Sequence, residues 1–121
     1  MANELKITTQ MRFSKGGTEL IRGSKDTFVT VSGNYAVHNV QAVGFAAAEA
    51  LIKGDITTVG YCWFKNLDAT NFVEVGYDDT GFKNVIKLKA GEEAVVRLGQ
   101  NTPQAQADTA GVKLEYIMVE D

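Results

Sequence analysis

Hydrophobic and polar residues alternate strictly along the first segment of the chain, residues 4–13. One face of this segment carries Leu5, Ile7, Thr9, Met11 and Phe13, and the other carries Lys6, Thr8, Gln10 and Arg12. A repeat of two residues is typical of a β-strand with one buried face. The pattern therefore predicts a half-buried strand near the start of the chain, ended by the Ser-Lys-Gly-Gly run that follows.

The clearest strand signals lie beyond residue 60, where β-branched and aromatic residues recur between short turn-forming stretches. The segments are YCWFKN, NFVEVGY, KNVIKLK, EAVVRL and VKLEYIMV. With DTFVTVS earlier in the chain, they suggest about seven or eight short strands at a spacing of roughly 8–12 residues. We expect an all-β fold: a single-domain antiparallel β-sandwich over residues 1–121, jelly-roll-like in its topology.

Two stretches fit this pattern less well. Residues 46–53 hold four alanines, a leucine and a glutamate, which are good helix formers. We favour a strand over residues 37–47 that runs into a loop, and a short helix at 46–53 is the alternative. Residues 99–111 are polar and contain the only proline, so they predict a long loop.

Composition narrows the classes of partner. The chain has 12 basic and 15 acidic residues and a net charge of −3, which argues against nucleic acid as a partner. No apolar run approaches the roughly 18 residues of a membrane span, and the N-terminus lacks the pattern of a secretory signal. Cys62 is the only cysteine, so an intramolecular disulfide is impossible. These features indicate folding in a reducing cytoplasm, without a membrane.

The triplet Asp79-Thr80-Gly81 matches the active-site triplet of aspartic proteases. Such enzymes hold two carboxylates about 3 Å apart, so a chain with one triplet would have to dimerise around Asp79. Asp and Gly between two strand-like segments are also what a tight hairpin turn requires. We interpret the triplet as a turn and keep a dimeric protease as a remote alternative.

No other pattern predicts a metal, cofactor or nucleophile. The acidic residues Asp68, Glu74, Asp78 and Asp79 do not follow the alternate spacing of a calcium loop, and we interpret them as a solvated surface cluster. One histidine, His38, and one cysteine are too few for a typical zinc site. We expect Cys62 to be a small core residue rather than a nucleophile activated by His38. No cofactor is expected.

Tyr61 and Trp63 share one face of a predicted strand. Two aromatic rings on one face could form a stacking platform for sugar rings. Aromatic residues more commonly fill the core of a β-sandwich, and we favour that interpretation for Trp63.

The run from residue 54 to residue 98 contains two phrases, KNLDATNFVEVG and IKLKAGEEAVVRL, the second with Gly91-Glu92 at its bend. This run resembles small structural proteins of tailed bacteriophages. The resemblance implies a virion component that assembles in the host cytoplasm: a head decoration (cement) protein, or a tail or fibre subunit. It brings no functional residues with it.

Together these observations predict a non-enzymatic virion structural protein, foremost a capsid decoration protein, that forms a homo-oligomer and contacts capsid or tail proteins. Edge strands and loops are its expected contact surfaces. The candidate interface residues are Leu5, Ile7, Met11, Phe13, Gln104 and Gln106. The N-terminal strand is expected in a sheet of its own chain, with an arm that pairs with a neighbouring copy as the alternative. The alternative function is a carbohydrate- or receptor-binding module of a tail fibre, with Tyr61 and Trp63 as its platform.

Overall fold

The computed structural model describes residues 3–121, except the side chains of residues 24 and 25. This part of the chain is all-β, its sheets are antiparallel, and it contains no helix. The strands are β1 (Leu5–Lys15), β2 (Thr18–Val29), β3 (Ala36–Val43), β4 (Glu49–Ala50), β5 (Val59–Asn66), β6 (Val73–Asp78), β7 (Phe82–Leu88), β8 (Glu93–Arg97), β9 (Gln104–Ala107) and β10 (Val112–Glu120).

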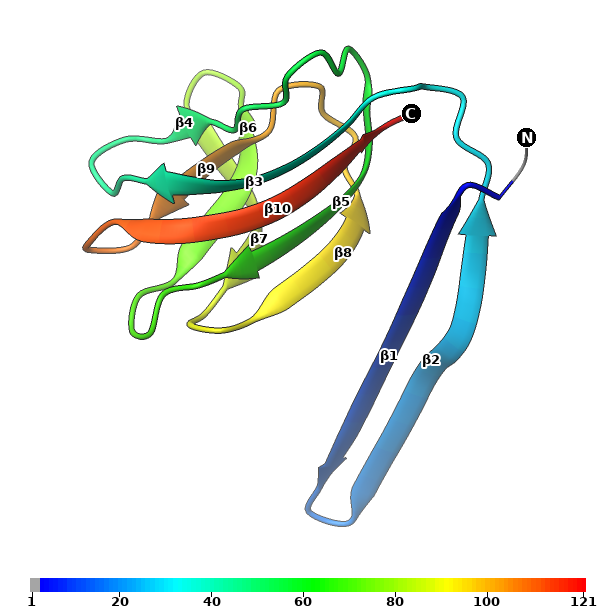
Figure 1. Cartoon of the computed structure of the whole chain (residues 1–121). Helices are drawn as coiled ribbons and strands as arrows, with labels where there is room; N and C mark the ends of the chain where they lie inside the picture. The colour runs from blue at the N-terminus through cyan, green and yellow to red at the C-terminus, as the bar shows by residue number, and fades with distance from the viewer. Residues whose placement is uncertain (1–2) are drawn as a thin grey trace. The chain divides into compact units, whose positions relative to one another are not determined.

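The chain divides into two compact units, Met1–Ser32 and Gly33–Asp121. The first contains the hairpin formed by β1 and β2, and we call the second the body (Figure 1). The single domain expected over residues 1–121 stays a prediction, because this division describes compactness alone.

The body contains two four-stranded sheets (Figure 1). Sheet I has the strand order β3-β10-β5-β8, and sheet II has the order β4-β9-β6-β7. Six pairs of neighbouring strands hold these sheets together, and each is antiparallel. Strands close in sequence often lie in different sheets, so the chain crosses repeatedly between the two layers.

Both sheets contribute to one hydrophobic core. In β5 and β10 every second side chain is buried, as strand geometry requires when one face of a sheet is covered. Sheet I contributes Val43, Cys62, Phe64, Val112, Leu114, Tyr116 and Met118, and sheet II contributes Val73, Val75, Leu88, Ala105 and Ala107. The predicted core position of Cys62 is confirmed, and burial raises the pKa of its thiol to about 12.

The alternative of a helix at residues 46–53 is wrong. This stretch holds bends and the short strand β4, and its backbone groups bond to distant parts of the body. The Gln41 side chain donates to the Ala50 carbonyl (3.0 Å) and accepts from the Ile52 amide (3.0 Å), while the Leu51 amide donates to the Pro103 carbonyl (2.9 Å). These bonds replace helical ones and bury Leu51, so tertiary contacts override helix propensity.

The long loop predicted over residues 99–111 is also wrong, because β9 lies inside it. Pro103, Ala105 and Ala107 are buried, and β9 pairs with β4 and β6. Two alanines are small enough to pack closely at the centre of sheet II. The stretch is therefore polar on average and yet contributes to the core.

Within the described residues, no helix has the length and apolarity that crossing a bilayer would require.

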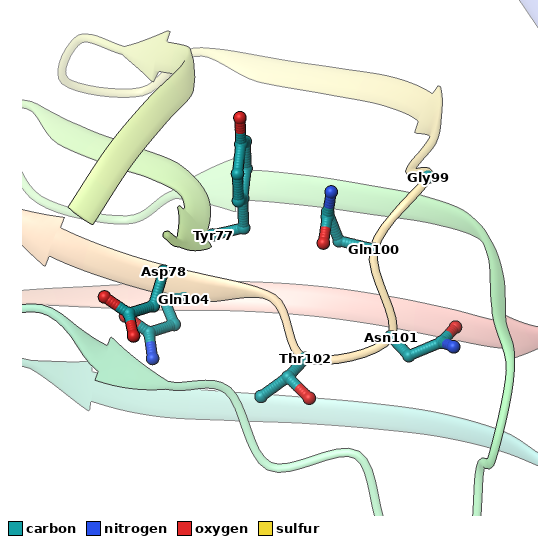
Figure 2. Close-up of a pocket in the computed structure, with 7 residues that line it drawn as sticks. All are labelled: Tyr77, Asp78, Gly99, Gln100, Asn101, Thr102 and Gln104. Carbon is teal, nitrogen blue, oxygen red and sulfur yellow. The ribbon is translucent and has the colours of Figure 1, made fainter. Parts of the chain in front are cut away.

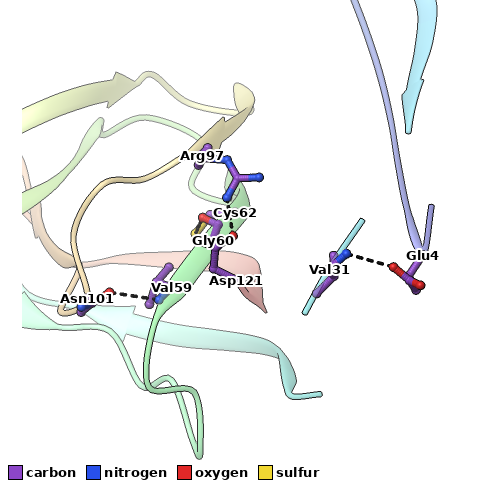
Figure 3. Close-up of polar contacts among 8 residues, drawn as sticks. All are labelled: Glu4, Val31, Val59, Gly60, Cys62, Arg97, Asn101 and Asp121. Atoms are coloured by element: carbon purple, nitrogen blue, oxygen red, sulfur yellow. Dashed lines mark hydrogen bonds and ion pairs between the residues drawn. The ribbon is translucent and has the colours of Figure 1, made fainter. Parts of the chain in front are cut away.

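The hairpin turns at Gly16 and Gly17, whose φ angles are +59° and +80°. Two consecutive positive φ angles fit the turn type that matches the twist of a two-residue hairpin, and glycine adopts them without strain. At the other end, the Val31 amide donates to the Glu4 carboxylate (2.9 Å; Figure 3). The glycine turn and the hydrogen bond between Val31 and Glu4 therefore close the hairpin at its two ends.

Candidate interaction surfaces

A bulge sets which side chains share a face of the hairpin. Thr8 pairs with Asp26 and Gln10 pairs with Gly23, so β2 has one residue more than β1 across this step. Gly23 has a φ of +87°, and a Cβ there would meet the Thr9 carbonyl. The extra residue reverses the alternation of β2, because one inserted residue exchanges the two faces of a strand.

As a result, one face of the hairpin carries six apolar residues, whereas Ile21 and Phe28 project from the opposite face. Leu5 pairs with Val29 and Phe13 pairs with Leu20, and directly opposed residues in an antiparallel pair project from the same face. We call this the apolar face of the hairpin: Leu5, Ile7, Met11, Phe13, Leu20 and Val29. Arg22 lies on it too, opposite Met11.

The apolar face is open to solvent at the turn end. Met11 is 77% exposed, Leu20 62% and Phe13 48%. The predicted half-burial of this strand is therefore wrong for Met11 and Phe13, because a two-stranded sheet provides no second layer to cover them. The expected pairing within its own chain is confirmed, with β2 as the partner of β1.

The opposite face of the hairpin carries paired charged groups and two exposed apolar residues, Ile21 opposite Arg12 (40% exposed) and Phe28 opposite Lys6 (56% exposed). Lys6 forms an ion pair with Asp26 (3.2 Å), and Arg12 forms one with Glu19 (3.7 Å). The Thr8 hydroxyl also donates to Asp26 (2.6 Å). Exposed pairs of this kind contribute little stability, so they distinguish the two faces more than they hold the strands together.

A second apolar surface lies on the outer side of sheet I. The strand register places His38, Ile117, Trp63 and Val95 in one row across all four strands. Ile117 and Val95 are each 37% exposed, Val40 is 49% exposed, and Trp63 is partly exposed. We call Val40, Trp63, Val95 and Ile117 the outer apolar patch. The core position favoured for Trp63 is wrong, because Cys62 and Phe64 take the inward positions of β5.

Tyr61 lies on the same outer side as Trp63, as its place in the alternation of β5 predicts. The Arg97 guanidinium lies over its ring, 4.5 Å from the centroid, and donates to the Asp121 carboxylate (2.6 Å; Figure 3). The pKa of Arg97 is raised, chiefly by this hydrogen bond. One face of the Tyr61 ring is thus occupied by Arg97, which makes that face unavailable for the predicted platform.

The predicted interface residues Gln104 and Gln106 belong to β9 in the body and are partly buried. Gln106 donates to the Phe45 carbonyl (3.0 Å). Gln104 lines a polar pocket with residues of β6 and of the loop before β9 (Figure 2). The lining residues are Tyr77, Asp78, Gly99, Gln100, Asn101, Thr102 and Gln104. The pocket is rich in amides and hydroxyls, so it offers hydrogen bonds rather than an apolar contact.

The Asp79-Thr80-Gly81 triplet forms the turn between β6 and β7, as predicted. Asp78 pairs with Phe82 across it, and the Gly81 amide donates to the Asp78 carboxylate (3.0 Å). Thr80 and Gly81 have φ angles of +52° and +125°. Asp79 is exposed in this turn and not part of a buried loop.

The remaining candidate groups have local structural partners. The Asp68 carboxylate accepts from the Asn71 amide (2.6 Å) and the Thr70 amide (3.0 Å), which lowers its pKa. His38 lies 2.8 Å from Glu115 on the outer side of sheet I, whereas Cys62 faces the core. Within residues 3–121, no three His, Cys, Asp or Glu side chains cluster as metal ligands would.

The Glu120 side chain binds backbone amides at two separate places in the body, one of them close to its first residue. Its carboxylate accepts from the Thr57 amide (3.1 Å) and the Asn34 amide (3.0 Å), and these bonds lower its pKa below the ordinary glutamate value. A lowered pKa in the folded state adds stability above the ordinary pKa of about 4.3, and this stability is lost as the pH falls through the lowered value.

We therefore expect Glu120→Gln to destabilise the body at pH 7 and to cost less at pH 3, because the stabilisation by the Glu120 carboxylate weakens as the pH falls towards its lowered pKa. Urea unfolding at both pH values measures this difference. Glu93→Gln is the control, because the one ion pair of Glu93 among the described residues is a surface pair with Lys65, at 3.9 Å. A Glu120→Gln effect of equal size at both pH values would contradict the assignment.

Comparison of the chain with protein-family models, curated proteins and solved structures finds no match. The surfaces described above are therefore the basis for proposing a function.

Proposed function

We propose that this chain is a non-enzymatic structural protein of a bacteriophage virion, foremost a capsid decoration protein that self-associates and binds neighbouring subunits. The observation that carries the proposal is the amphipathic hairpin with an uncovered apolar face, attached to a body that has a complete core of its own. Monomeric soluble proteins rarely expose large contiguous apolar patches, and such patches commonly mark a site of protein association.

The topology of the body supports the proposal. Its strand pairs β3·β10, β4·β9, β5·β8 and β6·β7 are nested around the β6–β7 turn. Wrapping a long hairpin of eight strands into two layers produces this set of pairs, so we propose that the body is a jelly-roll β-sandwich. Jelly rolls occur in viral capsid domains and also in lectins, so the fold alone does not choose between the two functions.

The run that resembles phage structural proteins, residues 54–98, contains β5, β6, β7 and β8. These are the middle strands of the nested set and include the innermost turn. The resemblance therefore covers a contiguous half of the proposed jelly roll. A decoration protein needs no catalytic centre, because many identical weak contacts on one particle add up through avidity.

The test is to find the chain in particles. We expect quantitative mass spectrometry of purified virions, from a phage that encodes this chain, to detect it at many copies per particle. After heads and tails are separated, it should remain with the heads. Its absence from purified virions would contradict the proposal, and its presence in tails alone would contradict the decoration role.

A further inference from the structure

We propose that the apolar face of the hairpin in one copy docks on the outer apolar patch of sheet I in a second copy. This inference rests on the proposed function for its biological setting, and it names the partner of the hairpin as another molecule of the same chain. The two surfaces are Leu5, Ile7, Met11, Phe13, Leu20 and Val29 on the hairpin, and Val40, Trp63, Val95 and Ile117 on the body.

The hairpin benefits from a partner. An isolated two-stranded ribbon is marginally stable in water, because it buries little apolar surface. Met11, Phe13 and Leu20 are large side chains close to the turn, and all three are exposed. Covering them would stabilise the hairpin and remove the apolar surface at the same time.

Charge favours a body of this chain, and not a second hairpin, as that partner. The unit Met1–Ser32 has five basic and three acidic residues, a net charge of +2. The body has seven basic and twelve acidic residues, a net charge of −5. Two hairpins repel each other and two bodies repel each other, whereas a hairpin and a body attract each other. This attraction favours the encounter of a hairpin with a body over the other two encounters.

Within the body, apolarity selects sheet I over sheet II. The row His38–Ile117–Trp63–Val95 is mostly apolar and crosses the whole sheet. The corresponding row of sheet II places Glu74 between Lys87 and Gln106. An apolar hairpin face would leave these polar groups without water or partners, which costs free energy.

Individual charges fit as well. Arg22 lies on the apolar face, and within the described residues no carboxylate lies within ion-pair distance of it. On sheet I, Glu93 pairs across the strands with Lys65, next to the row that contains Val95. Its only ion pair among the described residues is a loose one of 3.9 Å to Lys65, so it can accept Arg22 of a second copy.

Disulfide trapping between two separately expressed chains tests this docking. One chain carries Phe13→Cys and the other carries Val95→Cys, with different mass tags, so a mixed disulfide can form only between copies. Cys62 gives a low background because it is buried. The control chain carries Val85→Cys on β7 of sheet II, at a position that is 57% exposed and thus more accessible than Val95.

We expect the Phe13→Cys chain to trap Val95→Cys at least about tenfold faster than Val85→Cys, because docking raises the effective concentration of the two thiols. Equal trapping of both partners, or no trapping of either, would overturn the inference. If Val95→Cys does not fold, Ile117→Cys replaces it in the same row. If the chain is found in virions but shows no selective trapping, the docking is refuted and the virion role is not. If trapping is selective but the chain is absent from virions, the virion role is refuted and the docking is not.

Discussion

Replacing Phe64 by alanine is expected to lower the free energy of unfolding of the body by about 3–5 kcal/mol. Phe64 is fully buried on the inward side of β5 and belongs to the core cluster that both sheets share. Its removal takes away a large apolar side chain and leaves a cavity that the surrounding strands cannot fully close. Natural domains have a total stability of about 5–15 kcal/mol, so this one change would remove a large fraction. Urea unfolding followed by circular dichroism measures the loss.

The matched control is Val95→Ala on the adjacent strand of the same sheet. Val95 is on the outer side of sheet I and is 37% exposed, so we expect its truncation to cost less than about 1 kcal/mol in the monomer. Comparable losses for the two variants would show that Phe64 is not at the centre of the core. Unfolding is best measured at low protein concentration, because docking between copies would itself stabilise the chain.

Strand β5 shows which features of the fold the sequence alone predicts. Its alternation correctly separates Tyr61 and Trp63 from Cys62 and Phe64. It does not tell which pair is inside, because both faces carry aromatic side chains. The choice follows from the partner strands, since Leu114, Tyr116 and Met118 of β10 are buried on the same side as Phe64. Such information comes from tertiary packing and not from one strand.

The alternative of a helix at residues 46–53 and the loop predicted over residues 99–111 were wrong for a related reason. Their compositions favour a helix and a loop, but each forms a short edge or inner strand of sheet II. The Tyr116 hydroxyl donates to the Ile52 carbonyl (2.7 Å), and Gln41 binds the backbone on both sides of Leu51. Tyr116 is far away in the sequence and Gln41 lies outside residues 46–53, so the composition of this segment does not signal these bonds.

The first strand of the hairpin was predicted, but its exposure could not be predicted. Its period-two pattern is the same whether a second layer covers it or water does. The bulge opposite Thr9 was not predicted either, although a glycine inside a strand, here Gly23, is a common sign of a bulge. The pattern of β1 indicates that one of its faces packs against a second layer. The structure shows that the two-stranded hairpin itself contains no second layer.

Asn66 is the next residue where a small change should have a large effect. It is a fully buried polar side chain at the end of β5. Its amide nitrogen donates to the Asn71 carbonyl (2.8 Å) and the Leu88 carbonyl (3.1 Å), and its oxygen accepts from the Asp68 amide (2.9 Å). One side chain thus joins β5, the loop after it and the end of β7.

We expect Asn66→Asp, which keeps the shape, to cost about 3 kcal/mol or more at pH 7, because a buried carbonyl and a partly buried one lose their donor and face a buried carboxylate. Asn101→Asp is the control. Asn101 is exposed and uses its oxygen to accept from the Val59 amide (3.1 Å; Figure 3), a role that a carboxylate keeps. Urea unfolding of both variants against the unchanged chain should show a near-neutral control.

The pH dependence separates this explanation from simple loss of packing. Burial and the two facing carbonyls should raise the pKa of the new carboxyl in the folded state above the ordinary value of about 3.9. A raised folded pKa means that stability is retained below the ordinary value and lost as the pH rises through the raised one. The deficit of Asn66→Asp against the unchanged chain should therefore shrink between pH 7 and pH 4. A deficit that is constant across this range would mean that shape, and not the two donated hydrogen bonds, makes Asn66 necessary.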